Sequence, residues 1–584
     1  MTSDVDPLLS HLAFLYGEAA AGTAFEQLSA MLDRYRPRIP VPASAGLSER
    51  ESILITYGDQ VRQPDIQPLQ VLAGFCEAHL QGVVSGVHIL PFYPYSSDDG
   101  FSVVDYRQVD PALGGWEDIH HLGRHFRLMF DAVINHVSAG SAWFQAFLRQ
   151  QAPYKDYFIV VDGQPDLSRV VRPRTLPLLS RFSTVSGNKA VWTTFSDDQI
   201  DLNYANPRVL LDILETLLFY VAHGAEFIRL DAIAYLWKEV GTTCIHLPQT
   251  HRVVQLFRAV LDSMAPHVQL ITETNVPHAE NISYFGDGFD EAQMVYNFAL
   301  PPLVLHTFHA QDAQALTRWA ASLRLPSDRV TFFNFLASHD GIGVTPARGL
   351  VSDAELDAVV ERVRAHGGLV SYRSNLDGSQ SPYELNINYF DALSDPKADE
   401  SLQSQVDRFV AAHAIMFALV GVPGIYFHSL FGSRSWHEGV SITGRNRSIN
   451  RQKLDKAELE AGLYDSRSLR SQVFRRLALL LEARSSHPAF HPHGSQRALA
   501  LEPRLFAVLR RSPDGRQSVL CLQNVSSAPV SIHIDLGSLP FRSGEALVDL
   551  VTRVSYESDQ VQALRLGPYQ VVWLGEVNNG TQTP

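Results

Sequence analysis

Short apolar runs recur along the first two thirds of the chain, and most of them end in polar residues. Residues 53–57, 86–91 and 128–131 are such runs, and residues 69–80 between the first two carry apolar side chains at helical spacing. Runs of this length predict buried strands. Strands that alternate with helices at this pitch indicate βα units and a parallel sheet.

The pattern resumes after an irregular stretch, with a predicted helix at residues 209–223. Three further apolar runs lead to Asp231, to Glu273 and to the pair His339 and Asp340, and residues 424–427 form the last predicted strand. In a parallel barrel, the carboxyl ends of all strands open onto one mouth, where catalytic residues lie. We therefore predict an α/β fold, a (β/α)8 TIM barrel with loop insertions, whose mouth gathers these carboxylates.

Changes in the pattern indicate the domain organisation. Leu8, Leu12 and Leu15 recur at helical spacing, whereas short strands separated by turn residues follow residue 490. The predicted units are an N-terminal helical extension (1–50), the barrel (51–490) with insertions at 141–205 (domain B) and 343–395, and a C-terminal all-β domain (491–584).

The composition and charge of the chain argue against some classes of binding partner. The 584 residues are 45% hydrophobic and 19% charged, and the formal net charge is −14. An acidic chain without a basic run is not expected to bind nucleic acid. Because no stretch of about 20 apolar residues occurs, no membrane partner is expected either. A small-molecule substrate is the expectation that remains.

Cysteine usage and the N-terminus suggest an intracellular protein. Cys76, Cys244 and Cys521 are far apart and form no CxxC pattern, which argues against a disulfide framework and a structural zinc site. The first six residues lack the positive and apolar regions of a secretory signal, so we expect a cytoplasmic protein.

Asp231 is the first candidate catalytic carboxylate. Arg229 precedes it by two residues, so both side chains point to the same face of a strand. A cation in that position keeps an aspartate ionised and oriented, as a nucleophile attacking a sugar carbon requires. A buried structural ion pair is the alternative interpretation.

Glu273 and Asp340 end two other apolar runs. An apolar strand end beside a second carboxylate raises the pKa of a glutamic acid, as a catalytic acid needs. The pair of His339 and Asp340 is suited to hold sugar hydroxyls and to favour an oxocarbenium-like state. The alternatives are a helix cap or surface acid for Glu273, and a capping pair at a strand exit for Asp340.

Asn135 and His136 close the third predicted strand. The ligand spacing of a zinc site is missing around them, so hydrogen bonding to sugar hydroxyls is the preferred interpretation, with a core histidine as the alternative. The four polar blocks occur together and in order at strand ends. Their joint occurrence favours glycosidic bond chemistry over four separate structural explanations.

These blocks match the four motifs of the α-amylase superfamily, and the chain resembles its sucrose-phosphorylase-like branch over nearly all of residues 50–575. The resemblance implies that Asp231 is the nucleophile, Glu273 the general acid/base and Asp340 the transition-state stabiliser. His136, Arg229 and His339 would assist them. It also implies retention of α configuration by double displacement, a glucoside and inorganic phosphate as small-molecule partners, no metal and no organic cofactor.

Further substrate-binding residues follow from the same resemblance. Asp98, in the run Asp98-Asp99-Gly100-Phe101, resembles the glucose-pocket aspartate of the branch, and Phe101 resembles the aromatic wall of that pocket. Arg451 resembles the pocket arginine, and Tyr235 a pocket aromatic just after the nucleophile. On the acceptor side, Arg174 resembles the phosphate and acceptor arginine, and Tyr383 the mobile-loop tyrosine.

Two positions depart from sucrose phosphorylases. Asn275 stands where they have a histidine, and Glu384 where they have a loop glutamine. Both positions face the acceptor, and the surrounding stretches are more similar to glucosylglycerate phosphorylases. The resemblance then implies phosphorolysis of 2-O-α-glucosylglycerate by a monomer or homodimer, and four arginines are expected to suit an anionic acceptor: Arg174, Arg434, Arg445 and Arg447.

Other interpretations stay open at this stage. Sucrose phosphorylase and sucrose 6-phosphate phosphorylase share several of the same features. A retaining α-glucosidase or transglucosidase would use the same carboxylates without the phosphate site. A non-catalytic carbohydrate-binding barrel is disfavoured because all three carboxylates are present.

Overall fold

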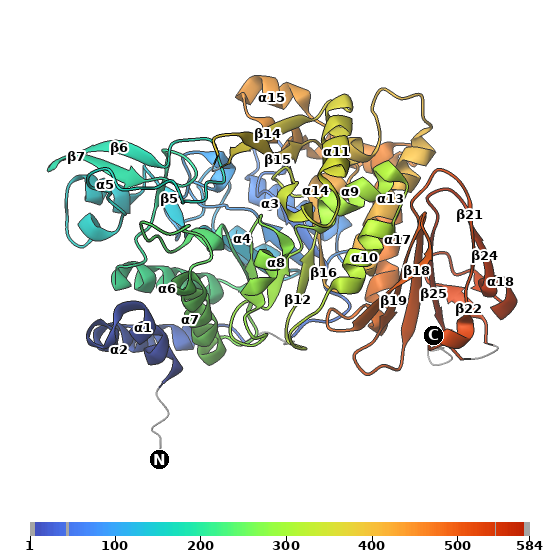
Figure 1. Ribbon diagram of the computed structural model, residues 1–584, viewed down its shortest axis with the longest axis horizontal. Helices are drawn as coiled ribbons and strands as arrows, with labels where there is room; N and C mark the ends of the chain where they lie inside the picture. Colours follow the sequence, from blue (N-terminus) through green and yellow to red (C-terminus); the bar gives the residue numbers. More distant parts are fainter. Residues whose placement is uncertain (1–5, 42–45, 376, 543–544, 577–584) are drawn as a thin grey trace, which may run out of the picture.

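A computed structural model describes residues 6–41, 46–375, 377–542 and 545–576. Its centre is a closed barrel of eight strands, each paired in parallel with the next along the chain, and with β16 closing onto β1 (Figure 1). The predicted TIM barrel is therefore confirmed. The strands are β1 (Ile53–Thr56), β3 (Gly86–Ile89), β4 (Arg127–Ala132), β9 (Ala225–Leu230), β10 (Gln269–Thr272), β11 (Met294–Tyr296), β12 (Thr331–Asn334) and β16 (Val422–Tyr426).

Two details of the strands differ from the sequence prediction. β11 was not recognised, because three residues are too short to show a pattern beside the apolar helix α9 (Leu300–Ala310). The prediction that Asp340 directly ends an apolar strand was wrong, since β12 stops at Asn334 and residues 335–340 form a loop. Asp231 and Glu273, in contrast, immediately follow β9 and β10.

Helices pack around the barrel, and local sequence signals start them. In α6 (Pro207–Ala222), the Asn206 side chain accepts a hydrogen bond from the Arg208 N–H, and Pro207 occupies the first position, where no N–H is needed. The apolar face of each helix covers the strands. The other main helices of this layer are α3 (Pro68–His79), α4 (Trp116–Leu122), α7 (Pro248–Met264), α10 (Gln314–Ser322), α13 (Leu402–Ala418) and α17 (Leu469–Ser485).

Two N-terminal helices, α1 (Pro7–Tyr16) and α2 (Glu18–Tyr35), lie against α7 and α6 (lower left in Figure 1). The Tyr16 hydroxyl donates to the Tyr204 carbonyl over 2.9 Å, and Arg34 lies 3.0 Å from Glu215. Residues 1–5, on which the signal-peptide expectation rests, lie outside the described residues. None of the described helices is long and apolar enough to cross a membrane.

Two irregular segments interrupt the barrel at its loops. The first, between β4 and β9, contains two antiparallel pairs and a short helix (left in Figure 1). These are β5 (His136–Ser138) with β8 (Gln199–Asp201), β6 (Leu179–Thr184) with β7 (Gly187–Trp192), and α5 (Ala142–Leu148). The second lies between β12 and β16 and contains β13 (Ile342–Gly343), α11 (Asp353–Ala365), β14 (Leu369–Ser374), β15 (Gln380–Asn386) and α12 (Tyr389–Leu393).

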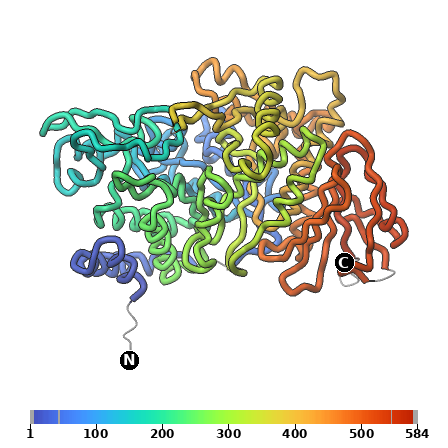
Figure 2. Tube along the Cα trace, in the orientation of Figure 1, coloured from blue at the N-terminus to red at the C-terminus, as the bar shows by residue number. Residues whose placement is uncertain are grey.

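The C-terminal part is an antiparallel β domain, which packs on the barrel beside α10 and α13 (right in Figures 1 and 2). Arg510 donates to the Ala418 carbonyl over 3.0 Å, and Gln496 donates to the Ala320 carbonyl over 3.1 Å. Its strands are β18 (Ser495–Glu502), β19 (Leu505–Arg511), β20 (Ser518–Asn524), β21 (Val530–His533), β22 (Leu547–Asp549), β23 (Ser555–Tyr556), β24 (Ala563–Leu566) and β25 (Val571–Glu576).

Short elements complete the fold in the loops and after β16. They are β2 (Val61–Arg62), β17 (Leu454–Asp455), α8 (His278–Asn281), α14 (Phe427–Leu430), α15 (His437–Thr443), α16 (Lys456–Tyr464) and α18 (Ser558–Gln562). β2 pairs in parallel with β17, which fastens the loop after β1 to the loop after β16 at the mouth.

Candidate active site

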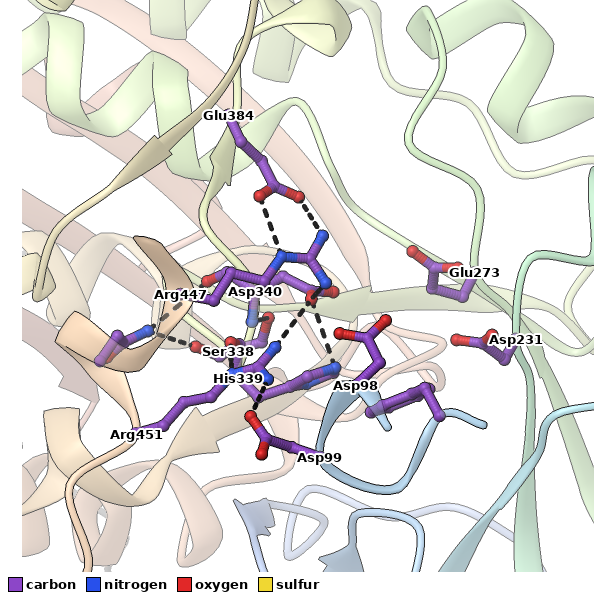
Figure 3. Close-up of polar contacts among 12 residues, drawn as sticks. Asp98, Asp99, Asp231, Glu273, Ser338, His339, Asp340, Glu384, Arg447 and Arg451 are labelled. Carbon is purple, nitrogen blue, oxygen red and sulfur yellow. Dashed lines mark hydrogen bonds and ion pairs between the residues drawn. The ribbon is translucent and has the colours of Figure 1, made fainter. Parts of the chain in front are cut away.

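Three carboxylates from separate parts of the chain line one cavity at the mouth of the barrel. Asp231 leaves β9, Glu273 leaves β10, and Asp340 lies in the loop after β12. Figure 3 shows Asp231 and Glu273 side by side, with Asp340 facing them across the cavity. Neighbouring parallel strands bring the first two together, since Thr272 and Leu230 are partners in the register.

One buried guanidinium joins the carboxylates at the floor. Arg229 Nη1 donates to Asp231 Oδ1 over 2.9 Å and to Asp131 Oδ1 over 2.5 Å, and Nη2 lies 3.8 Å from Glu273 Oε1. His88 Nε2 lies 2.7 Å from Asp131 on its other side. Arg229 thus orients Asp231. Because three carboxylates share the positive charge of Arg229, it does not fully neutralise Asp231.

Burial raises the pKa of both Asp231 and Glu273, and their mutual repulsion adds to the effect on Asp231. At a given pH, this pair of carboxyls therefore retains a proton more readily than two isolated carboxyls do. Arg229 lies closer to Asp231 than to Glu273, so negative charge is better placed on Asp231 and the proton on Glu273. This distribution is the one that a nucleophile and an acid need.

Asp340 has the opposite electrostatic environment. Burial alone would raise its pKa, but Arg447, at 2.5 Å, and Arg451, at 3.7 Å, outweigh burial and hold the pKa well below its usual range. Burial lowers the pKa of His339 to about 3, so this imidazole is neutral at physiological pH. Asp340 therefore remains an anion at pH values where Asp231 and Glu273 still hold a proton.

Aromatic and amide groups form the inner wall of the cavity. The Phe101 ring stacks on His339 with centroids 4.6 Å apart, and the His136 Nε2 atom lies 2.9 Å from the Phe101 carbonyl. Tyr235 lies on the same cavity, with its ring edge-on to Phe195. A sugar ring presents both apolar faces and hydroxyls, and this wall offers contacts for both.

Asp98 and Arg451 both lie near this wall, but they do not contact each other. Asp98 pairs with Arg174 over 3.3 Å, whereas Arg451 pairs with Asp99 and donates from Nε to the His339 carbonyl over 2.8 Å. Burial raises the pKa of Asp98, but the arginines outweigh it, so the pKa falls below its usual value. Asp98 lines the inner cavity, and Arg451 lines the outer cavity described next.

An outer cavity of about 600 Å³ continues from the inner one. Glu384 and Tyr383 on β15 line both, and Glu384 holds Arg447 through Nε and Nη2, at 3.1 and 2.5 Å (Figure 3). Asn275 lines the inner cavity, where its amide packs against Gly343. A Cβ at Gly343 would lie 2.5 Å from the Asn275 oxygen, so this approach requires glycine.

Two residues that the sequence placed at the substrate lie elsewhere. Asn135 is fully buried and hydrogen-bonds Lys238 and Asp201, over 2.7 and 3.2 Å, rather than facing the cavity. Arg434 pairs with Asp391 over 2.7 Å and does not line either cavity. The expectation that both contact substrate was wrong, because each is held by a buried acid that sequence spacing does not reveal.

The sequence did not indicate several residues that line the inner cavity. Gln199 Nε2 lies 3.2 Å from His136 Nε2, and Phe195, Phe298 and Pro173 also line the inner cavity. Phe195 and Gln199 lie in the irregular insertion, where no periodic pattern marks them.

Known proteins are similar to this chain over most of its length. The model of the α-amylase catalytic domain matches residues 80–342. The chain is 50% identical to a glucosylglycerate phosphorylase of Spirochaeta thermophila, with 98% of each chain covered. It is 52% identical to a glucosylglycerate phosphorylase of Allomeiothermus silvanus, with 89% of this chain and 93% of that protein covered.

The chain belongs to the glucosylglycerate phosphorylase family. The family lies in the sucrose phosphorylase branch of the α-amylase superfamily, as the sequence motifs indicated, and its members are glycoside phosphorylases. A crystal structure of sucrose 6F-phosphate phosphorylase from Thermoanaerobacter thermosaccharolyticum superposes with a TM-score of 0.73 and 26% identity, covering 88% of this chain and 100% of that one.

Proposed function

We propose that this protein catalyses the reversible phosphorolysis of 2-O-α-glucosylglycerate to α-D-glucose 1-phosphate and glycerate. The observation that carries the proposal is the pairing of a two-carboxylate centre with an arginine-lined outer cavity, in a chain about half identical to glucosylglycerate phosphorylases. The carboxylates supply glycoside chemistry, and the arginines supply sites for anions.

In the first half-reaction, Glu273 donates its proton to the glycosidic oxygen while Asp231 attacks the anomeric carbon. Glycerate leaves, and a β-glucosyl ester forms on Asp231. The positive charge that develops on the sugar ring is stabilised by Asp340, which arginines keep ionised. When the ester forms, Asp231 loses its negative charge, so Arg229 loses one of its ionic partners.

In the second half-reaction, phosphate replaces glycerate in the outer cavity. Glu273, now a carboxylate, accepts the proton of the attacking phosphate hydroxyl, and the ester bond to Asp231 breaks. The product has the α configuration after two inversions. Each step runs in both directions, so glucose 1-phosphate and glycerate regenerate the glucoside and phosphate.

The anionic acceptor is supported by the charges of the outer cavity. Arg174, Arg445, Arg447 and Arg451 line it, together with two carboxylates, Asp98 and Glu384. Arg174 pairs with Asp98, Arg447 with Glu384 and Arg451 with Asp99, whereas Arg445 makes no ion pair with a described residue. The excess positive charge is available to the carboxylate of glycerate or to phosphate. A neutral ketose offers no charge to match it.

The reverse reaction provides the decisive assay. Purified protein receives α-glucose 1-phosphate with glycerate, glycerol, fructose or fructose 6-phosphate in separate reactions, and released phosphate is measured. We expect glycerate to give a rate at least about tenfold above the neutral acceptors glycerol and fructose, since a charge-assisted hydrogen bond is worth about 1.5–3 kcal/mol. Fructose 6-phosphate is also an anion, and the identity with glucosylglycerate phosphorylases is the reason to expect glycerate to exceed it. A comparable rate with fructose or fructose 6-phosphate would reject the glycerate assignment, and release of glucose without an acceptor would indicate a hydrolase.

We also propose that the reaction takes place in the cytoplasm. The three cysteines are free and buried, which suits a reducing compartment. A monomer or homodimer is proposed for the assembly, and light scattering of the purified protein measures it.

A further inference from the structure

A cluster of metal-ligating side chains lies on two barrel helices, apart from the catalytic cavity. Glu77 on α3, His121 on α4 and His125 just after α4 place one ligand atom each within 4.8 Å of the others. His121 Nε2 lies 2.7 Å from Glu77 Oε1, and His125 Nε2 lies 3.7 Å from the same oxygen. Three donors from two helices thus converge on one point.

The central oxygen of this cluster lacks a hydrogen-bond donor. Glu77 Oε1 is buried and accepts no hydrogen bond from any described residue, although His121 Nε2 is close. A buried carboxylate oxygen without a partner is costly. A cation bound between the carboxylate and the two imidazoles would remove this cost.

We infer that Glu77, His121 and His125 form a surface site for a divalent transition-metal ion of the Zn²⁺ class. Two imidazoles and one carboxylate, with water as the fourth ligand, are a donor set that zinc accepts. At zinc–ligand distances of about 2.1 Å, tetrahedral donors stand about 3.4 Å apart. The 2.7 Å separation of His121 and Glu77 must therefore widen, and the larger separations must contract. The side chains of His121 and His125 are 45% and 36% exposed and are free to rotate inward.

Gln81 completes the environment of His125. Its Nε2 atom lies 3.1 Å from His125 Nδ1. A half-turn of the Gln81 amide places its oxygen there instead, where it accepts the Nδ1 proton and leaves the Nε2 lone pair for the metal. Outer hydrogen bonds of this kind commonly fix the tautomer of metal-binding histidines.

The position of the site predicts a structural role. α3 leads into β3 and α4 leads into β4, so the ends of both helices lie at the amino-terminal face of the barrel, opposite the mouth. A metal there ties two consecutive βα units together. It stabilises the folded chain by mass action without touching the substrate.

The test uses the full-length protein, stripped with a chelator and titrated with Zn²⁺ alone at mildly alkaline pH, where imidazole is neutral. We expect one ion to bind per chain by calorimetry, a Tm that rises with zinc concentration, and unchanged turnover. Mg²⁺, which prefers oxygen ligands, should give no comparable binding.

Variants separate this site from adventitious binding. His121→Ala and His125→Ala should each remove the calorimetric signal and the Tm increase, and both residues are exposed enough for the fold to persist. His120→Ala is the matched control, because His120 on the same helix faces away and contacts His223 over 3.1 Å. No saturable zinc binding by the wild type, or equal losses in all three variants, would overturn the assignment.

Discussion

At the scale of single residues, charge balance around Arg229 supports the different roles that we propose for two similar carboxyls. Asp131, Asp231 and Glu273 all approach this one buried guanidinium, with His88 as a further partner of Asp131. More acids than cations are buried here, so a proton is retained in the cluster. The distances to Arg229 favour Glu273, the carboxyl farthest from it, as the site of this proton, which suits the acid role that we propose for Glu273.

Replacement of either proposed catalytic carboxyl should abolish turnover and leave the fold intact. Glu273→Gln removes the transferable proton, so we expect kcat to fall by about 10²–10⁴-fold in both directions. Asp231→Ala removes the covalent step and should leave no measurable phosphorolysis. Circular dichroism and initial rates of glucose 1-phosphate formation measure the two effects.

The control for these variants is Glu280→Gln. Glu280 follows Glu273 in the same loop region, but it pairs with His246 over 3.3 Å and does not line either cavity. Its activity should stay close to that of the wild type. Near-wild-type activity in Asp231→Ala or Glu273→Gln would contradict the assigned roles.

Loss of the Arg174 side chain should slow attack by phosphate on the glucosyl-enzyme more than attack by water. Its guanidinium lines both cavities and lies 3.3 Å from Asp98. Arg174→Ala removes a charge-assisted contact worth about 1.5–3 kcal/mol, so kcat/KM for phosphate should fall by about 10- to 100-fold. Slow hydrolysis of the glucosyl-enzyme should change little, and the ratio of glucose 1-phosphate to glucose therefore drops.

Arg172→Ala provides the comparison, because Arg172 lies two residues away and lines neither cavity, although it donates to the carbonyl of Leu176, which lines the outer one. This variant should keep the product ratio of the wild type. Equal losses of phosphorolysis and hydrolysis in Arg174→Ala would mean that Arg174 only supports its loop.

At the scale of elements, the turn after β9 contributes to holding the side chain of Glu273. Ala232 adopts a left-handed conformation, with φ of 50°, and its N–H donates to Glu273 Oε2 over 3.0 Å. This backbone geometry is unfavourable for branched side chains. The turn thus links the residue after Asp231 directly to Glu273.

Ala232→Val should disturb this link. A β-branched residue in the left-handed region costs about 1–3 kcal/mol, so the turn relaxes and the N–H leaves Glu273. We expect kcat to decrease by about tenfold and Tm to fall. Ala232→Gly tolerates the same φ and should retain nearly full activity; a similar loss in both variants would show that side-chain contacts, rather than the turn, are responsible.

The elements also show what the sequence could predict. Apolar runs located seven of the barrel strands, and the family resemblance named residues that the structure places around one cavity, such as Asp231, Glu273 and Tyr383. β11 has only three residues, too few for a pattern. Gln199 and Phe195 reach the cavity from an irregular insertion, and such contacts depend on tertiary packing that local spacing does not encode.

At the scale of the whole molecule, the buried acids make stability depend on pH. Burial raises the pKa of Asp231 and Glu273 in the folded state, so the folded chain binds protons more tightly than the unfolded chain. Stability from this pair is therefore present at acidic pH and is lost as the pH rises through the raised pKa values. Asp340, with its lowered pKa, contributes in the opposite sense, because its stabilisation is lost as the pH falls.

Glu273→Gln should therefore be more stable than the wild type where the pair is ionised. Glutamine cannot ionise, so the variant avoids the cost of burying charge, and its Tm should exceed that of the wild type by about 1–3 °C at pH values above the raised pKa of Glu273. The difference should shrink as the pH falls below the raised pKa of Glu273, where the wild-type carboxyl is protonated. Differential scanning calorimetry across this pH range measures the Tm difference. Glu361→Gln is the control, because Glu361 on α11 is 66% exposed and the Tm difference of this variant should stay constant. A Tm difference for Glu273→Gln that grew toward acidic pH would mean that the cavity favours the ionised carboxyl, and the assignment of the proton to Glu273 would then fail.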